Sequence, residues 1–222
     1  MTQIKEMFAP KGSSARSGYA MQPKYITIHN TANTGRNAGA QAHGAYLQGA
    51  GSRKSVSYHY AVDDALIVRI IPDKENAWHA GDGAKGTGNR QSLGIEICEN
   101  PETNLLNATN NAAELTAHLM HDYGIDIDHV VQHNYWTGKN CPNRIRVSQP
   151  YNWDTFKTKV MQCYQALYPK PDVDAKPVAK PLDKNQWYAV QAGAYKTEAE
   201  ARELADKLEA QGFNAFVYVK EV

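Results

Sequence analysis

Residues 130–142, Val-Val-Gln-His-Asn-Tyr-Trp-Thr-Gly-Lys-Asn-Cys-Pro, constrain the fold more than any other part of the chain. The stretch begins with β-branched residues typical of a buried strand, and it breaks at Gly138 into a loop. The segment carries an imidazole (His133), an ammonium (Lys139) and a thiol (Cys141), and only a loop can bring the imidazole and the thiol together. Either they never meet, as a core histidine and a small buried thiol, or they share a metal ion. The interleaved lysine favours the metal.

A third metal ligand is predicted upstream, at His29. The run 25–31, Tyr-Ile-Thr-Ile-His-Asn-Thr, alternates as a strand does, and its end delivers an imidazole to the sheet edge where α/β folds collect their chemistry. Neutral imidazole and thiolate are preferred ligands of Zn²⁺, which is usually tetrahedral in proteins. His29, His133 and Cys141 would therefore hold one Zn²⁺ ion and leave the fourth position for water, as catalytic sites do.

Several motifs occur in the order seen in one protein family: residues 25–31, residues 57–63 (Ser-Tyr-His-Tyr-Ala-Val-Asp), residues 78–83 (Trp-His-Ala-Gly-Asp-Gly), residues 94–98 (Gly-Ile-Glu-Ile-Cys) and residues 133–142. With them the chain resembles the zinc-dependent N-acetylmuramoyl-L-alanine amidases of type 2, the peptidoglycan-recognition-like family. It is particularly similar to phage and prophage endolysins of Gram-positive bacteria. The resemblance covers residues 20–165, and several ordered motifs are more specific than any single short pattern.

The resemblance implies an α/β fold with a central mixed β-sheet flanked by helices. It also implies hydrolysis of the amide between N-acetylmuramic acid and L-alanine in bacterial peptidoglycan, by water that Zn²⁺ activates. A rival interpretation is a non-catalytic peptidoglycan-recognition protein, because the same fold serves as a receptor in other lineages. Such relatives typically lose the cysteine ligand, which Cys141 retains here. A structural-zinc protein is a second rival, but it would need a fourth protein ligand, and the sequence offers no convincing one.

Glu96 is the predicted general base. Leu93, Ile95 and Ile97 point to one side of the strand 92–98, which puts Glu96 on the other. A carboxylate in a central strand is costly to bury unless its pKa is raised or it is paired, and beside activated water it is well placed to take a proton. The alternative is a solvent-exposed glutamate on an edge strand. Lys139, between two ligands in the sequence, is expected to stabilise the developing oxyanion.

Four residues are candidate substrate contacts. Asn30 and Thr31 follow the predicted ligand His29 directly, although turn and cap duties explain them equally well. Trp78 and His79 open a glycine-rich loop, and an aromatic face suits sugar rings and lactyl groups. That loop is therefore predicted to form a wall of the substrate site, the alternative being a mobile surface loop anchored by one tryptophan.

The remaining histidines that compete for a metal position are expected to have other roles. His59 lies between small residues of a predicted strand and is interpreted as structural or pocket-lining. His118 and His121 are three apart in a predicted amphipathic helix, where solvated or rim histidines are the simpler interpretation. His129 precedes His133 by four positions, which in a strand separates the two rings too far to share one ion. Cys98 is expected to pack in the core.

Periodicity predicts the other regular elements. Helices are expected over 37–48, 107–123 and 152–167, where apolar residues recur at helical spacing, and Gly124 is expected to end the second of them. An antiparallel hairpin is expected from the strands 56–62 and 65–71. Residues 1–22 are polar and contain glycine and serine, and they are expected to be a lead-in without a defined role.

Composition excludes several function classes. The 24 Lys and Arg nearly balance the 23 Asp and Glu, so no overall charge favours nucleic acid or acidic lipid. No apolar run approaches the length of a membrane span, and residues 1–9 lack the apolar core of a signal peptide. Three cysteines without disulfide spacing suggest synthesis in a reducing cytosol. Action on the cell wall would then need holin-assisted release or lysis, as the resemblance implies.

The composition divides the chain into residues 1–168, a catalytic domain; residues 169–184, a Pro- and Lys-rich linker; and residues 185–222. The last segment is expected to form a β-α-β unit, with strands over 187–195 and 213–219 and a helix that Thr197 and Glu200 cap. It resembles half of a SPOR peptidoglycan-binding domain, which implies binding to bare glycan. Because so short a unit is marginal alone, self-association or docking on the amidase is expected.

Overall fold

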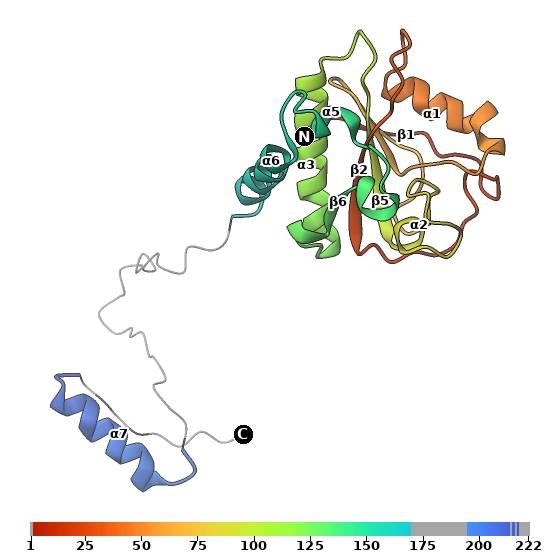
Figure 1. Ribbon diagram of the computed structural model, residues 1–222. Helices are drawn as coiled ribbons and strands as arrows, with labels where there is room; N and C mark the ends of the chain where they lie inside the picture. Colours follow the sequence, from red (N-terminus) through yellow and green to blue (C-terminus); the bar gives the residue numbers. More distant parts are fainter. Residues whose placement is uncertain (1, 170–194, 214, 216, 218–222) are drawn as a thin grey trace. The chain divides into compact units, whose positions relative to one another are not determined.

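The computed structural model describes residues 2–169, 195–213, 215 and 217. The chain divides into two compact units, residues 1–171 and residues 172–222, and each is described by itself. The first unit is built on a six-stranded mixed sheet with helices on both faces (Figure 1), as the α/β prediction requires. Among the helices in the described part of the chain, none combines the length and the apolar character needed to cross a lipid bilayer.

The sheet has the strand order β1-β4-β3-β5-β2-β6. Only β3 and β4 pair antiparallel, which confirms the predicted hairpin, and the other neighbours pair parallel. The three parallel strands β5, β2 and β6 therefore end at the same edge, where α/β sheets place their chemistry. The strands are β1 (Ile4–Glu6), β2 (Tyr25–Asn30), β3 (Tyr60–Val62), β4 (Ile67–Arg69), β5 (Ser92–Ile97) and β6 (Val130–Gln132).

Helix α3 covers one face of the sheet and α6 packs outside it, while α1 lies against the opposite face (Figure 1). Of the short helices, α2 leads into the amino end of β5, α4 follows the carboxyl end of β6, and α5 packs against β2 and α6. The helices of the first unit are α1 (Ala40–Gln48), η1 (Ala50–Arg53), α2 (Thr87–Gln91), α3 (Leu105–Tyr123), η2 (Ile127–His129), α4 (Asn134–Thr137), α5 (Asn143–Arg146) and α6 (Trp153–Leu167).

Alternation along β5 separates the core from the site. Leu93, Ile95 and Ile97 are fully buried in the larger hydrophobic cluster, which also contains the apolar face of α3. Complete burial of such a side chain stabilises the fold by about 1.5–3 kcal/mol. Gly94 and Glu96 point to the other face, where a Cβ on Gly94 would meet the ring of His79 and Glu96 lies beside His29. The sequence alternation is therefore confirmed, and it places the predicted base on the face opposite the main core.

Local capping signals set the ends of the two long helices. Asn104 accepts a hydrogen bond from the Asn107 amide at the start of α3, and Gly124 ends that helix with a positive φ of 64°. Asn152 caps α6 by accepting from the Thr155 amide. The two long predicted helices are thus confirmed to within two residues, because their boundaries depend on side chains next to them in the sequence, whereas α1 begins three residues later than predicted.

The N-terminal residues have more structure than the predicted lead-in. β1 adds a parallel edge strand beside β4, and Ala9 and Ala15 are buried in the smaller hydrophobic cluster. The guanidinium of Arg16 donates two hydrogen bonds to the carboxylate of Glu75, of 2.7 and 2.8 Å. A three-residue strand is too short to show periodicity, and its pairing partner lies 63 positions away, so the sequence carried no local signal for it.

Of the second unit, the structure describes one helix, α7 (Glu198–Ala210). The predicted capping box is present, because the Thr197 hydroxyl accepts from the Glu200 amide and the Glu200 carboxylate accepts from the Thr197 amide. The predicted linker 169–184 lies, after its first residue, outside the described residues. So do most of the two strands predicted over 187–195 and 213–219, and the β-α-β arrangement therefore stays a prediction.

Candidate metal centre

His29 and Glu96 are directly opposite each other on adjacent parallel strands, β2 and β5. Their side chains point to the same face of the sheet, and His29 Nδ1 lies 3.9 Å from Glu96 Oε1. On its other side Glu96 pairs with Ala61 of β3, so it stands in the middle of the sheet with a small neighbour. The alternative of a solvent-exposed edge-strand glutamate is excluded, because β5 lies between β3 and β2 and the Glu96 side chain is 15% exposed.

A closed loop after β6 brings His133, Lys139 and Cys141 together. The amide of Asn134 donates to the carbonyl of Cys141 at 3.0 Å, and the Asn134 side chain donates to the carbonyl of Lys139 at 3.0 Å. The stretch leaves the strand earlier than predicted, since a one-turn helix, α4, follows His133 and ends at Gly138 with a positive φ of 76°. These contacts close the loop, so that Lys139 and Cys141 return to the edge of the sheet at which His133 lies.

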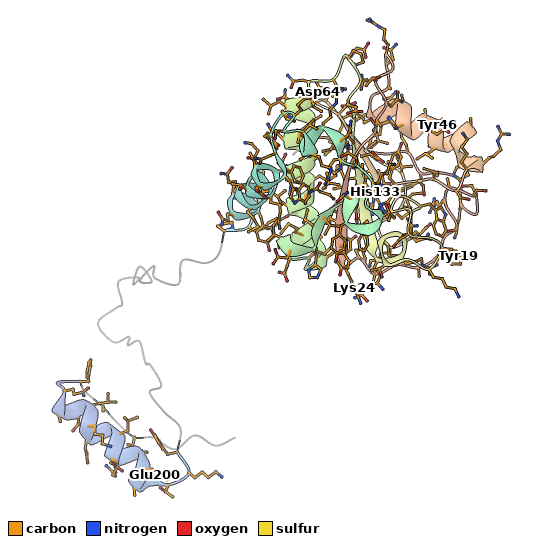
Figure 2. The ribbon with its side chains drawn as sticks, in the orientation of Figure 1. Tyr19, Lys24, Tyr46, Asp64, His133 and Glu200 are labelled. Atoms are coloured by element: carbon orange, nitrogen blue, oxygen red, sulfur yellow. The ribbon has the colours of Figure 1, made fainter. Side chains whose placement is uncertain are left out.

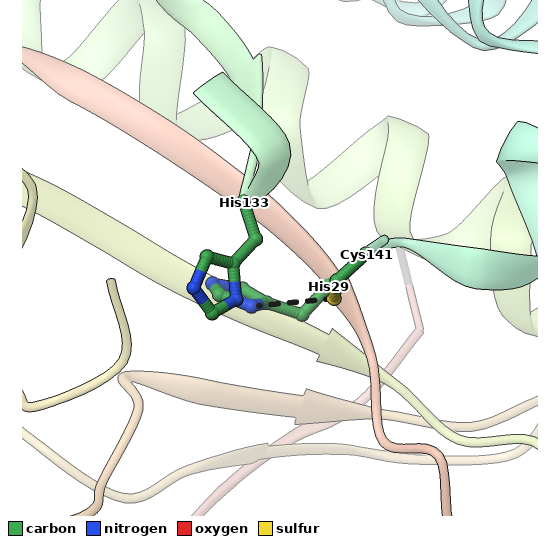
Figure 3. A group of neighbouring side chains, drawn as sticks. All are labelled: His29, His133 and Cys141. Carbon is green, nitrogen blue, oxygen red and sulfur yellow. Dashed lines mark hydrogen bonds between the residues drawn. The ribbon is translucent and has the colours of Figure 1, made fainter. Parts of the chain in front are cut away.

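The three predicted metal ligands converge (Figure 3), and Figure 2 shows where one of them, His133, lies in the first unit. One nitrogen of His29, one of His133 and the sulfur of Cys141 all lie within 4.8 Å of one another, and all three residues are buried. Cys141 Sγ lies 3.7 Å from His29 Nδ1. His133 Nδ1 and Glu96 Oε2 are both buried, and neither atom has a hydrogen-bond partner among the described residues. Two imidazoles and a thiol with such orphaned atoms fit a Zn²⁺ ion, with the Glu96 carboxylate beside it.

Burial dominates the electrostatics of the site. It raises the pKa of Glu96 to about 8, while the nearby ammonium of Lys139 acts in the opposite direction. Burial also raises the pKa of the Cys141 thiol to about 11 and lowers the pKa of both His29 and His133. The imidazoles are therefore held neutral, which is the form that binds metal, and the thiol would lose its proton to an ion.

Lys139 is exposed on the closed loop, at the mouth of the buried group. Its charge lowers the pKa of Glu96, His133 and Cys141, so the ammonium lies close enough to act on all of them. An exposed cation beside a buried carboxylate and a thiol can approach a substrate without leaving the site. The role of Lys139 as an oxyanion stabiliser stays a prediction.

His79 lies beneath His29 instead of on the surface of the predicted substrate wall. It is 7% exposed, and both its ring nitrogens are hydrogen-bonded, Nδ1 to His29 Nε2 and Nε2 to the carbonyl of Ser92, each at 3.0 Å. No ring nitrogen remains for a substrate. The prediction of substrate contact is therefore wrong for this residue, because a loop motif does not show which of its side chains turn inward.

Asn30 is also buried, at 4% exposed, and its side chain holds the chain that follows Cys141. Its Oδ1 accepts from the amide of Arg144 at 3.1 Å, and its own carbonyl lies 3.9 Å from Cys141 Sγ. The hydroxyl of Thr31 accepts from the Asn33 amide at 3.4 Å and so belongs to a turn. The contacts of both residues match the alternative considered for them, which was a role in turns and caps. Asn30 in particular is not placed to touch substrate.

Trp78 is the one residue of the predicted wall that is partly exposed beside another aromatic ring. The rings of Trp78 and Tyr19 meet edge to face with centroids 6.4 Å apart, and Tyr19 is 53% exposed. The Trp78 amide donates to Ser57 Oγ at 3.0 Å, which fixes its backbone. The loop is thus anchored at its tryptophan.

Two residues near Glu96 were not singled out by the sequence. Tyr58 is 8% exposed, and its hydroxyl is hydrogen-bonded to His43 Nδ1 of α1. Burial raises the pKa of Tyr58, and the charge of Glu96 raises it further. The only local signal was the position of Tyr58 beside His59 in the motif 57–63.

The other histidines and Cys98 agree with their predicted roles. His59 is fully buried, its Nδ1 accepting from the Gly94 amide at 2.9 Å and its Nε2 donating to the Glu75 carbonyl at 3.0 Å. His118 and His121 contact Tyr168 at the end of α6, the first through the phenol and the second by stacking. Cys98 packs in the smaller hydrophobic cluster.

The chain matches two sequence families. The family described as N-acetylmuramoyl-L-alanine amidase matches residues 19–144, and the SPOR domain family matches residues 165–219. The latter match begins within α6, upstream of the predicted boundary at residue 185, and includes residues that the structure does not describe.

Among curated proteins, the chain is similar to the N-acetylmuramoyl-L-alanine amidase CwlH of Bacillus subtilis, with 47% identity over 145 residues. The match covers 65% of this chain and 57% of CwlH, so the chain corresponds to little more than half of that protein. Among solved structures, a mutant endolysin from Bacillus subtilis has a TM-score of 0.68 at 47% identity, covering 72% of this chain and 99% of that one. The catalytic domain of XlyA has a TM-score of 0.67 at 46% identity, with the same coverage.

Proposed function

Because this chain belongs to the family of N-acetylmuramoyl-L-alanine amidases, we propose that it hydrolyses the amide bond joining N-acetylmuramic acid to the L-alanine of peptidoglycan. The observation that carries the proposal is the convergence of His29, His133 and Cys141 within 4.8 Å beside the buried carboxylate of Glu96. The substrate class is peptidoglycan, and the site of action is the cell wall.

His29, His133 and Cys141 would hold one Zn²⁺ ion. When bound, zinc would supply Lewis acidity, which activates water and polarises the scissile carbonyl. The protein's part is to present two neutral imidazoles and a thiol in a buried, rigid group. Because the described residues supply no fourth protein ligand to the cluster, the site has the composition of a catalytic zinc site and not of a structural one.

Glu96 would take the proton from the attacking water and pass it to the nitrogen of the leaving L-alanine. Its Oε2 is buried without a partner among the described residues, so it is available to a water molecule. Burial places its pKa near 8, close enough to neutrality for a group that must both accept and release a proton. Lys139 would stabilise the negative charge that develops on the carbonyl oxygen.

Trp78 and Thr31 remain the candidates for substrate contact. Trp78 offers a partly exposed aromatic face, which suits the lactyl group and sugar ring of N-acetylmuramic acid. Thr31 follows β2 directly and is partly exposed at the carboxyl end of the sheet. Asn30 and His79 would support the metal ligands from behind, which is a different role from the one predicted for them.

The SPOR match supports a second binding activity in the C-terminal part. Amidase action removes stem peptides and leaves bare glycan, the ligand that the SPOR resemblance implies. The C-terminal part would retain the enzyme on wall that it has already cut, and pairing with a second copy would complete a half-domain. One of the solved relatives is named an endolysin, which supports action on the cell wall. Release through a holin or by lysis of the cell stays a prediction.

The test is digestion of purified Gram-positive cell walls by the parent protein, Glu96→Gln and Asp128→Asn, each with its zinc content measured. Asp128 is a control, because it is an exposed carboxylate that pairs with Lys157. We expect the parent and Asp128→Asn to release new L-alanine amino termini. Glu96→Gln should retain zinc and release them roughly 10²–10⁴-fold more slowly, the usual contribution of general acid–base catalysis.

Each alternative has its own outcome in this experiment. A parent protein that binds zinc and walls but releases no amino termini is a peptidoglycan-binding protein without the activity. Equal rates for the parent and Glu96→Gln would leave the enzyme standing and refute the role of Glu96.

A further inference from the structure

His79 and His29 belong to a continuous chain of hydrogen bonds that starts on the sheet backbone. His79 Nε2 lies 3.0 Å from the carbonyl oxygen of Ser92 in β5, and His79 Nδ1 lies 3.0 Å from His29 Nε2. The chain ends at His29 Nδ1, which faces Cys141 Sγ at 3.7 Å. It therefore runs from a fixed backbone atom to the ligand atom of the candidate metal site.

This chain of contacts determines where each imidazole carries its proton. A carbonyl oxygen can only accept, so His79 Nε2 must carry a hydrogen. In the neutral ring Nδ1 is then an acceptor, and His29 Nε2 must donate to it. His29 Nδ1 is left with a free lone pair directed at the thiol of Cys141, which is what a metal ligand requires.

The surroundings hold the His79 ring in place. The amides of His79 and Ala80 both donate to Asn89 Oδ1, at 2.9 and 2.8 Å. A Cβ on Gly94 would lie 2.7 Å from His79 Cγ, so the absence of a side chain in the central strand makes room for this ring. The ring of His59 closes the other side, edge to face at 5.9 Å.

We propose that His79 is a positioning residue that fixes the tautomer and ring plane of His29, so that Nδ1 is the atom offered to the metal. The inference rests on the proposed metal site. Ligating histidines usually donate their second N–H to a carboxylate, a carbonyl or water, and loss of such a partner typically weakens metal affinity 10–100-fold. Here the imidazole of His79 takes that place, and the hydrogen bond to the Ser92 carbonyl fixes the orientation of His79 itself.

The tautomers can be measured directly on the zinc-free, full-length protein with ¹⁵N-labelled histidine. Long-range ¹H–¹⁵N correlation spectra distinguish Nδ1–H from Nε2–H rings. We expect both His29 and His79 to be Nε2–H. A His29 ring with its proton on Nδ1 would overturn the inference, whatever the protein's activity.

Zinc affinity, measured against a chromophoric chelator, gives a second readout. His79→Leu should bind Zn²⁺ on the order of 10–100-fold more weakly than the parent. His79→Asn should recover much of that affinity, because its amide oxygen can accept from His29 in place of Nδ1. His59→Leu is the matched control: it also removes a fully buried ring with two hydrogen bonds, and that ring touches the edge of His79 while its hydrogen bonds go to Glu75 and Gly94. It should lower the zinc affinity much less than His79→Leu does.

The outcomes separate this inference from the proposed function. A parent protein that binds no zinc would overturn the metal site and the inference together. Zinc binding by the parent with equal affinity in His79→Leu, or equal losses in His79→Leu and His59→Leu, would overturn the inference alone. If His79→Leu does not fold, the zinc affinities of His79→Asn and His59→Asn, together with the tautomer spectra, still decide whether His79 positions His29.

Discussion

Glu96 is a residue whose position is unfavourable for stability and favourable for chemistry. It lies between buried isoleucines in a central strand, and His29 Nδ1 lies 3.9 Å from its carboxylate. Burial without full pairing raises its pKa to about 8, which is the cost of keeping a carboxylate there. A hydrophobic residue would stabilise the sheet better at this position. A carboxylate held here beside three candidate metal ligands fits the general base that we propose.

Lys139 brings a positive charge to this buried group. We expect Lys139→Met to lower turnover on the order of 10²–10³-fold, because one contact to the developing oxyanion is lost. The KM and the zinc content should change little, since the contact is made in the transition state. Lys139→Arg, which keeps the charge, should retain more activity. A variant that raised KM alone would instead assign Lys139 to ground-state binding of the substrate.

The lowered pKa of His59 predicts how the stability of the protein depends on pH. Burial lowers its pKa to about 4, from about 6.5 in the unfolded chain. Below pH 6.5 the unfolded chain therefore binds the additional proton, and the stability that His59 contributes is lost as the pH falls from about 6.5 toward 4. His59→Asn should reduce the slope of the free energy of unfolding against pH in this window by up to about 1.4 kcal/mol per pH unit.

Urea unfolding of the zinc-free protein at several pH values checks this slope. Above pH 7 the curves of parent and His59→Asn should run parallel, offset only by the lost packing and hydrogen bonds. Identical slopes below pH 6.5 would show that His59 does not titrate on unfolding.

At the scale of elements, the end of β2 organises the site. One residue, His29, offers a ligand, and the next, Asn30, holds the start of α5 through the amide of Arg144. The thiol of Cys141 is thereby tied to the same strand as the first imidazole. Strand β2 thus positions two of the three ligands.

Asn30→Leu should loosen this connection. The buried Arg144 amide would lose its acceptor, which typically costs about 1–3 kcal/mol, and zinc affinity should fall because Cys141 is less firmly placed. Amide hydrogen exchange of Arg144, together with a zinc titration, measures both effects. Thr31→Val is the control, since it removes a turn hydrogen bond without touching the Cys141 loop. Equal zinc affinity in Asn30→Leu and the parent would contradict the role of Asn30.

At the scale of the whole molecule, the chain combines an amidase unit with a C-terminal part that matches the SPOR family. The catalytic domain of XlyA was solved as a separate chain and matches 72% of this one, so residues 1–168 are expected to fold alone. We expect this fragment to cleave soluble muropeptides at the rate of the full chain. It should sediment with peptidoglycan stripped of stem peptides much more weakly.

Co-sedimentation with stripped and intact walls, alongside the muropeptide assay, tests this division of labour. Equal retention of the fragment and the full chain on stripped walls would show that the C-terminal part does not bind glycan. Sedimentation equilibrium of the full chain tests the proposed pairing between copies.

The sequence by itself determined what depends on near neighbours and on chemical type. Helix ends at Asn104, Gly124 and Thr197 follow from capping side chains beside them, and strand β5 follows from its alternation. The candidate ligand set of two imidazoles and a thiol follows from the chemistry of zinc together with the family motifs. All of these signals are local or compositional.

Only the tertiary structure decided which side chains stand behind the ligands. The register that sets His29 opposite Glu96, and the packing that puts His79 on Gly94, join residues 67 and 15 positions apart. Asn30 and His79 were predicted as substrate contacts because they lie next to a ligand or in a family motif. They turn inward because their polar atoms find partners on other strands and loops, and the pairing of distant segments is not encoded in any one stretch.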